Sequence, residues 1–275
     1  SGITIVNSAN NTLIGGTTAA ARNVISGNAQ YGITVESSTS GTQIQGNYIG
    51  TNVAGTGALA NAWSGIRLIY SVTNTTIGGT TTGAGNLVSG NGGHGITIEA
   101  WSTSNTLQGN YVGTNAAGTA AITNNGYGVN LDNSSSNTIG GTATGARNVI
   151  SGNANHGVLV NNATGNNIQG NYIGTNTAGT AAIANGGWGG VALYNGATGN
   201  TVGGSVAGRN IISGNAHYGV LVHSSGMNTV SANYIGTDVT GTAKLGNGDI
   251  GIVLENGAGS NTIGGIGVGN VIAGN

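Results

Sequence analysis

The chain has 275 residues, with 57 glycines, no proline or phenylalanine, and only 4% charged residues. Its formal net charge of −1 removes the electrostatic basis for binding nucleic acid or an anionic membrane. The absence of cysteine excludes disulfides, thiolate metal sites and cysteine nucleophiles, and no apolar run approaches the roughly 20 residues of a membrane-spanning helix.

One hexapeptide recurs along the whole chain. NVISGN or a close variant of it begins at Asn23, Asn86, Asn148, Asn210 and Asn270. A related motif, NYIGTN, alternates with it and begins at Asn47, Asn110, Asn171 and Asn233. Internal repetition of this kind is typical of solenoids, in which each repeat buries its apolar face against its neighbours.

Each half-repeat predicts the same three short strands in the same order. The first strand follows a glycine and has apolar residues one and three positions later, as in Ile3 and Ile5, which indicates a strand with one buried face. The second strand is centred on an apolar residue such as Ile14, and the third on one such as Ile25. The pattern occurs nine times, after Gly2, Gly32, Gly65, Gly95, Gly128, Gly157, Gly190, Gly219 and Gly251.

This pattern predicts an all-β fold of nine coils of about 30 residues. Parallel strands in a flat sheet need helical crossovers, and the sequence contains no amphipathic helix. Stacked coils pair their strands without such crossovers, so we expect a parallel β-helix with the usual right-handed connection. Residues 1–275 are predicted to form a single domain, because the period is unbroken.

The connections between strands alternate from coil to coil. Odd coils have extra residues between the second and third strands, as in Thr17–Arg22 and Thr142–Arg147. Even coils have a long loop after the third strand, as in Asn52–Ser64, and we expect apolar residues of these loops to fold back on the body. These residues are Leu59, Ile122, Ile183 and Leu245.

Asparagine occupies fixed corner positions in every coil. Stacked side-chain amides can hydrogen-bond from coil to coil, and asparagine tolerates turn geometry, so a structural ladder is predicted. Its members are Asn23, Asn47, Asn86, Asn110, Asn148, Asn171, Asn210, Asn233 and Asn270. A second ladder is predicted five residues later, at Asn28, Asn52, Asn91, Asn115, Asn153, Asn176, Asn215, Asp238 and Asn275.

Two rows of side chains are candidates for contact with a partner. The outward position of the first strand becomes apolar in the last four coils, at Leu159, Ala192, Leu221 and Val253, which predicts either a contact surface or a patch covered by the chain itself. Trp63, Tyr127 and Trp188 end three of the long loops and recur every second coil. Such rings either stack on sugars or pin the loops to the body.

The titratable residues show no catalytic motif. Glu99 and Asp132 fall in one column on adjacent coils, and are interpreted as a solvated, mildly repelling pair. Asp238 and Asp249 bracket one long loop, where they could hold a cation weakly. His94 and His156 lie two coils apart, which is too far to share a metal, and no histidine has an evident acidic partner. We therefore predict no catalytic residues, no metal and no cofactor.

The ends of the sequence suggest a function. Its first and last residues fall in phase with the repeat, with no capping segment, so self-stacking or continuation into a longer solenoid is expected. The predicted partners are copies of the chain, adjoining coils or a polysaccharide, but neither nucleic acid nor an inserted membrane. The predicted function is a non-enzymatic extracellular or cell-surface subunit of a filament, stalk or fibre.

The motifs NTIGG, NVISGN and IQGNYIGTN resemble those of the right-handed parallel β-helix repeat family of large secreted or surface-anchored bacterial proteins. The resemblance covers all nine coils and implies the fold, but the fold hosts lyases, adhesins, fibres and ice binders. A carbohydrate-binding adhesin segment remains the main alternative. A polysaccharide lyase or hydrolase, and an ice-binding protein with one rank of threonines, are more remote alternatives.

Overall fold

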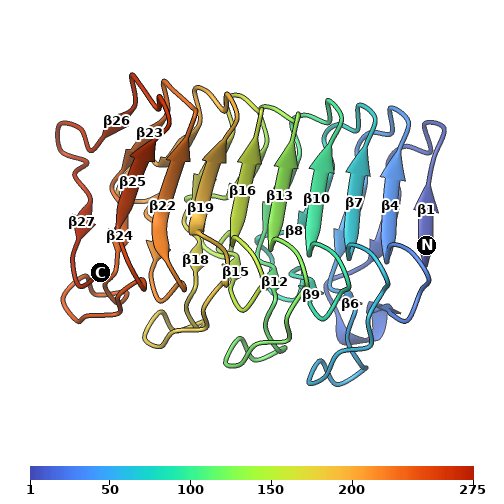
Figure 1. Ribbon diagram of the computed structural model, residues 1–275. Helices are drawn as coiled ribbons and strands as arrows, with labels where there is room; N and C mark the ends of the chain where they lie inside the picture. Colours follow the sequence, from blue (N-terminus) through green and yellow to red (C-terminus); the bar gives the residue numbers. More distant parts are fainter.

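The computed structural model describes residues 1–275 as a rod of nine stacked coils (Figure 1). Its 27 short strands form three nine-stranded sheets, which we call A, B and C, and the only helix is a short 3-10 turn, Ala19–Ala21. Every strand pair is parallel and joins equivalent strands of successive coils, such as β1 and β4. The predicted all-β solenoid is confirmed, and the architecture matches a right-handed parallel β-helix.

The strands recur in the order predicted from the sequence, one from each sheet in every coil. Sheet A consists of β1 (Ile3–Ile5), β4 (Ile33–Glu36), β7 (Ile66–Ile69), β10 (Ile96–Glu99), β13 (Val129–Asp132), β16 (Val158–Asn161), β19 (Gly189–Tyr194), β22 (Tyr218–His223) and β25 (Ile252–Glu255). Sheet B consists of β2 (Leu13–Gly15), β5 (Gln43–Gln45), β8 (Thr76–Gly78), β11 (Thr106–Gln108), β14 (Thr138–Gly140), β17 (Asn167–Gln169), β20 (Thr201–Gly203), β23 (Thr229–Ser231) and β26 (Thr262–Ile263). Sheet C consists of β3 (Val24–Ile25), β6 (Tyr48–Ile49), β9 (Leu87–Val88), β12 (Tyr111–Val112), β15 (Val149–Ile150), β18 (Tyr172–Ile173), β21 (Ile211–Ile212), β24 (Tyr234–Ile235) and β27 (Val271–Ile272).

The core is a column of aliphatic side chains enclosed by the three sheets. A single cluster of 34 buried residues contains the inward positions of all three strands, for example Ile33, Ile44 and Ile49 in the second coil. Because inward and outward residues alternate along a strand, the outer face of sheet A carries every residue between two core positions. No helix of the chain has the length and apolar character needed to cross a membrane.

The coil glycine lies where two successive coils approach most closely. A Cβ atom on Gly128 would lie 2.6 Å from the carbonyl oxygen of Gly157 and 2.6 Å from Cγ2 of Ile150. Both atoms belong to packed neighbours that cannot move away easily. The glycine that marks each coil in the sequence is therefore required by backbone proximity.

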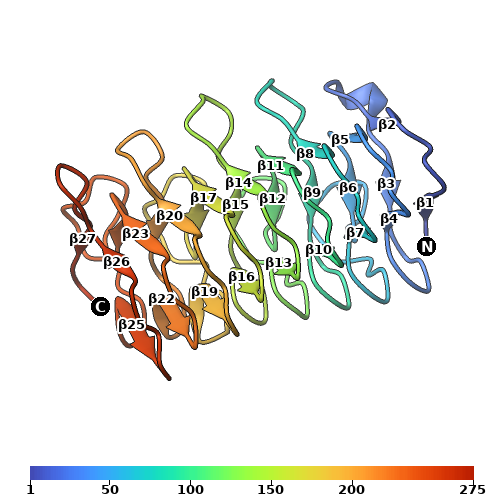
Figure 2. The same cartoon turned by 90° about the horizontal axis from the view of Figure 1, so that it is seen from above.

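The long loops of the even coils project from one edge of the rod, beside sheet C (Figure 1), whereas the loops of the odd coils project from another side, beside sheet B (Figure 2). Each closes on itself through an antiparallel bridge, such as that between Thr114 and Ala121. Ile122 and Ile183 are buried as predicted, whereas Leu59 is 52% exposed, so the fold-back of apolar loop residues is incomplete.

The predicted asparagine ladder at the sheet B–sheet C corner is present as a continuous chain of amide hydrogen bonds. Nδ2 of Asn110 donates to Oδ1 of Asn148 at 3.0 Å, and to the carbonyl oxygen of Ile77 at 2.9 Å. The same link joins each neighbouring pair from Asn23 to Asn270. The buried amides thus hydrogen-bond both to the next coil and to a carbonyl group of the preceding coil.

The second predicted ladder is wrong in the even coils. Asn91 is linked to Asn124, and Asn124 to Asn153, at 2.9 and 3.0 Å. The even-coil members are the asparagines that follow the long loops, and not Asn52, Asn115, Asn176 or Asp238. Asn115 opens its loop instead, because its Oδ1 accepts the backbone N–H of Thr119 at 2.9 Å. The loop insertion therefore moves the ladder position along the chain.

A third ladder precedes the strands of sheet B and was not predicted. It joins six successive coils through Asn105, Asn137, Asn166, Asn200, Asn228 and Asn261. The signal for it in the sequence is an asparagine immediately before the first strand residue, as in the motif NTIGG at Asn137.

Candidate functional site on the outer face of sheet A

Three columns of side chains run along the outer face of sheet A, parallel to the rod axis. The ring column lies immediately before the coil glycine and contains Tyr31, His94, Tyr127, His156 and Tyr218. The central column lies two residues after that glycine and contains Thr34, Arg67, Thr97, Asn130, Leu159, Ala192, Leu221 and Val253. The strand-end column lies four residues after it and contains Glu36, Ile69, Glu99, Asp132, Asn161, Tyr194, His223 and Glu255.

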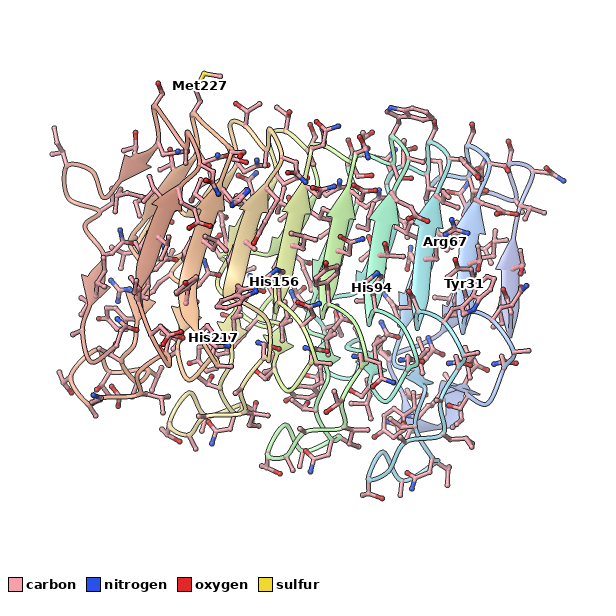
Figure 3. The ribbon with its side chains drawn as sticks, in the orientation of Figure 1. Tyr31, Arg67, His94, His156, His217 and Met227 are labelled. Atoms are coloured by element: carbon pink, nitrogen blue, oxygen red, sulfur yellow. The ribbon has the colours of Figure 1, made fainter.

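The aromatic and imidazole rings on this face stack on one another from coil to coil. Tyr127 lies between His94 and His156, with ring centroids 4.8 and 5.4 Å apart and nearly parallel planes. The row then passes to the strand-end column, where Tyr194 lies 5.8 Å from His156 and 4.9 Å from His223. Figure 3 shows the labelled His94 and His156 on this face, with Tyr31 and Arg67 towards the N-terminal end.

The two central histidines are held neutral. Nδ1 of His94 accepts the backbone N–H of Tyr127, and Nδ1 of His156 accepts that of Gly189, both at 3.0 Å. Burial lowers the pKa of His94, and it lowers the pKa of His156 to about 4. Because Nδ1 is an acceptor, the neutral ring carries its proton on Nε2.

Three pairs of charged or titratable groups cross from one coil to the next. Nε of Arg67 donates to Oε1 of Glu99, and Arg67 also lies over the ring of Tyr31. His217 contacts Asp249 through Nδ1 and Oδ2 at 2.7 Å.

The third pair joins His223 and Glu255, through Nδ1 and Oε1 at 3.0 Å. The expectation that no histidine has an acidic partner is therefore wrong. Both members of this pair are the fourth residue after their coil glycine, so aligning the coils would have revealed it.

Glu99 and Asp132 do not form the predicted pair, although their backbones are in register. Glu99 contacts Arg67 of the preceding coil, whereas Asp132 accepts a hydrogen bond from Asn161 of the following coil at 2.6 Å. Asp238 accepts hydrogen bonds from its own loop, above all from the Thr240 hydroxyl, which lowers its pKa, and is not joined to Asp249. No group of three metal-ligating side chains occurs in the chain.

Three hollows follow one another along this face. The first, of about 280 Å³, is lined by residues that include Tyr31, Trp63, Arg67 and Glu99. The second, of about 580 Å³, includes Tyr127, Asp132, His156, Trp188 and Tyr194. The third, of about 250 Å³, is lined by Trp188, Tyr194, Tyr218, Leu221, His223 and Glu255. The last two share Trp188 and Tyr194 and are therefore neighbours.

The predicted contact row is covered by the chain itself. Leu159, Ala192 and Leu221 are buried beneath Tyr127, Tyr194 and Tyr218, and Val253 packs beside them. The outward apolar residues thus form a second small core beneath the aromatic rings, and do not form an exposed patch. Of the two alternatives that the sequence left open, the row is therefore a patch covered by the chain itself.

The three predicted stacking residues fall into two groups. Trp63 and Trp188 are 48% and 55% exposed and lie at the rim of the hollows. Both faces of the Tyr127 ring are occupied by His94 and His156, so Tyr127 belongs to the packing. The tryptophans are the rings that a ligand could reach.

No protein-family model and no curated protein sequence matches the chain. Among solved structures, the periplasmic alginate epimerase AlgG matches 85% of this chain and 46% of its own, at a TM-score of 0.60 and 17% identity. A double mutant of AlgG matches 95% of this chain and 47% of its own, at a TM-score of 0.55 and 15% identity. The chain therefore spans about half the length of these structures. At such identity the likeness shows a shared β-helix fold.

These comparisons contradict two predictions, that the chain is a non-enzymatic filament subunit and that it is not an enzyme. Both solved structures described above, which share its coil architecture, are those of an enzyme. The sequence argument relied on the absence of linear motifs, but stacked coils bring groups together across about 30 residues, as with His223 and Glu255. End-to-end stacking of copies stays an untested prediction.

Proposed function

We propose that the chain is a polysaccharide-modifying enzyme that holds a glycan along the outer face of sheet A. The observation that carries this proposal is the His223–Glu255 pair in a hollow rimmed by Trp188 and Tyr194. Exposed tryptophan rings stack on sugar faces, and a row of hollows along a rod suits a linear polymer. The fold shared with an epimerase of alginate, itself a polysaccharide, supports the same conclusion.

His223 is the proposed general base. The Glu255 carboxylate beside Nδ1 favours a proton on that nitrogen, which places the lone pair of the neutral ring on Nε2. Nδ2 of Asn256 lies 3.0 Å from Nδ1 and 3.4 Å from Nε2, so this amide must move away from Nε2 when the base accepts a proton. Tyr194 lies 4.9 Å away, ring to ring, and burial followed by the Glu255 charge raises its pKa. Tyr194 therefore stays protonated and can donate a hydrogen bond or a proton to the substrate.

The charge of this face favours a neutral glycan. Glu36, Glu99, Asp132, Asp249 and Glu255 all lie on sheet A or at its edge, whereas Arg67 is its only arginine or lysine and is paired with Glu99. A polyanion such as alginate would be repelled by this balance. We therefore do not propose alginate, the substrate of AlgG, as the substrate of this chain. By analogy with AlgG, whose name places it in the periplasm, we infer a location outside the cytoplasm.

The test is turnover of a panel of neutral polysaccharides, followed by proton NMR of the products. His223→Gln and Glu255→Gln should each lower kcat at least about 100-fold, the usual contribution of a positioned acid or base. Asp249→Asn is the matched control, because it changes the carboxylate of the same type of histidine–carboxylate pair outside the hollow and keeps the His217 ring, which lies 4.6 Å from that of Trp188. Its kcat should stay within about threefold of the wild type.

Two outcomes would contradict the proposal. Equal losses in the Glu255 and Asp249 variants would show that the hollow has no special role. Absence of turnover, combined with glycan retention that depends on Trp188 in affinity electrophoresis, would indicate a binding surface without catalysis.

A further inference from the structure

A second groove lies on the outer face of sheet C, away from the proposed catalytic face. Its floor alternates tyrosines of the even coils with aliphatic residues of the odd coils, as in Tyr111, Val149, Tyr172 and Ile211. The loops of odd coils form one wall, and Thr177 and Val239 of the long loops lie opposite. The groove has a volume of about 590 Å³, comparable to the largest hollow on sheet A.

Two arginines that line this groove each lie over a tyrosine ring. The guanidinium carbon of Arg147 is 4.0 Å from the ring centre of Tyr172, and that of Arg209 is 4.0 Å from the ring centre of Tyr234. Nε of Arg209 also donates to the carbonyl oxygen of Ala232 at 2.9 Å, which fixes its position. A guanidinium has five N–H donors, so most of those on both arginines are unused by the protein.

The positive charges of the groove are not neutralised. No aspartate or glutamate lines it. Five of the six carboxylates belong to the sheet A side, and Asp238, on the long loop beside β24, is engaged by Thr240 and the amides of its own loop. An arginine–tyrosine contact that only stabilised the turn between two sheets would not need to line a groove.

We infer that this groove binds an anionic polysaccharide, with one acidic group at Arg147 and another at Arg209. The two arginines are two coils apart, which is roughly 10 Å at the strand spacing of a sheet. Each is stacked on its own tyrosine, so they cannot converge on one small anion. A linear polymer with recurring charges satisfies both, and the hydroxyls of Thr142, Thr144 and Thr177 in the walls can bind its sugar hydroxyls.

The covered ring of Tyr172, in the floor of the groove, argues against nucleic acid as the occupant. Single-stranded nucleic acids bind by stacking bases on exposed aromatic faces. Tyr172 is buried, and the accessible side of the ring is taken by Arg147. The groove therefore offers guanidinium edges and hydroxyls, which suit carboxylate or sulfate groups on a sugar chain.

Binding of the intact chain to dextran sulfate, polygalacturonate and uncharged dextran, measured by biolayer interferometry over a range of salt concentrations, tests this inference. We expect either anionic polymer to bind and dextran not to bind to this groove. Arg147→Gln and Arg209→Gln should each weaken binding about tenfold, and the slope of log affinity against log salt should fall by about one for each arginine removed. Binding of only one anionic polymer would identify the preferred acidic group.

Arg22→Gln is the matched control. Arg22 lies 3.9 Å from the ring centre of Tyr48 and so forms the same stack, but outside the groove. Its loss should change affinity less than twofold, and circular dichroism should show all variants folded. Arg147→Lys, which keeps the charge but not the planar donor array, should lose less affinity than Arg147→Gln.

The inference is overturned if Arg22→Gln weakens binding as much as Arg147→Gln, because net charge would then explain the effect. It is also overturned if a single-stranded oligonucleotide of similar charge binds equally well, or if neither anionic polymer binds. Because the arginines are remote from His223, turnover of a neutral glycan should be unchanged in these variants, so this inference and the proposed function fail separately.

Discussion

The imidazole of His156 carries no charge at neutral pH because its surroundings oppose protonation. It lies between the rings of Tyr127 and Tyr194, and no ion pair includes it. Its Nδ1 accepts a backbone hydrogen bond that a protonated ring could not accept. The histidine is thus, like His94, a packing and hydrogen-bonding group, whereas His217 and His223 contact carboxylates.

This environment predicts acid sensitivity. The pKa of His156 is about 4 in the folded chain and near 6.5 in the unfolded chain, so between these values only the unfolded chain binds the proton. The free energy of unfolding should therefore fall as pH falls through this range. His156→Asn keeps an acceptor for Gly189 but does not titrate.

Urea unfolding at two pH values would measure the effect. Relative to the wild type, the stability of His156→Asn should rise by roughly 2 kcal/mol between about pH 7.5 and about pH 4.5. A difference between the two proteins that stays constant with pH would contradict this explanation.

Gly128 illustrates a different constraint at the same scale. A Cβ there meets a backbone carbonyl of the next coil, so Gly128→Ala should destabilise the chain by about 2 kcal/mol or more, as overpacking does. Gly269 has no atom within 4 Å of an added Cβ, and Gly269→Ala should be nearly neutral. Thermal unfolding of the two variants compares them directly, and an equal loss in both would be inconsistent with the close approach.

The asparagine ladders are the elements that fix the corners. Each buried amide donates to the next coil and to a carbonyl group of the preceding coil, so one substitution leaves several buried groups without a partner. The residue spacing within the chain predicted the second ladder at Asn115, whereas the structure places it at Asn124. Substitution at these two positions should therefore reduce stability by different amounts.

Asn124→Ala should cost about 3 kcal/mol or more, because Oδ1 of Asn153, the carbonyl oxygen of Val88 and the backbone N–H of Asn91 each lose a partner in the interior. Asn115→Ala should cost about 1 kcal/mol, since its contacts are those of a surface loop. Chemical denaturation measures the free energy of unfolding of both variants. A larger loss of stability in Asn115→Ala would support the ladder predicted from the sequence, at Asn115, and contradict the one at Asn124.

The strands were predictable because their physics is local. Apolar residues alternate with a period of two after a fixed glycine, and this marks the same strand in all nine coils. Where one coil departs from the pattern, the other coils still show the position of the strand. The first asparagine ladder followed for the same reason. The prediction of the second ladder was wrong in the even coils because their long loop lies before the corner. The corner residue therefore cannot be found by counting from the preceding motif.

The candidate site was less predictable because its partners come from different coils. His223 and Glu255 lie 32 residues apart, and only their common position after a coil glycine relates them. The cover of Leu159 and Leu221 by Tyr194 and Tyr218 depends on ring orientation, which the sequence does not contain. Their apolar character was evident, but not which side chains would lie over them.

The molecule as a whole separates its charges across the rod. Arg22, Arg147, Arg209 and Lys244 lie on the side of sheet C and its loops, while five carboxylates lie on the side of sheet A. A net charge of −1 therefore conceals two faces of opposite sign. The two proposed grooves differ in the glycans they favour for this reason.

The repeat architecture also predicts how stability is distributed. The strands of each coil pair only with those of the neighbouring coils, so backbone amides in the middle of the rod are protected on both sides. In native-state hydrogen exchange followed by mass spectrometry, peptides containing β13 and β16 should exchange last, and those from the long loops first. Uniform exchange along the rod would indicate a single cooperative unit and contradict this expectation.

Because the loops alternate, equivalent environments recur only every second coil. A tandem duplication of one coil would place two loops of the same type side by side, whereas duplication of two coils would leave every join in phase. Genes for such proteins can therefore lengthen in steps of about 62 residues. Each step would extend both faces by roughly 10 Å, so the number of sugar units in contact would grow with the gene.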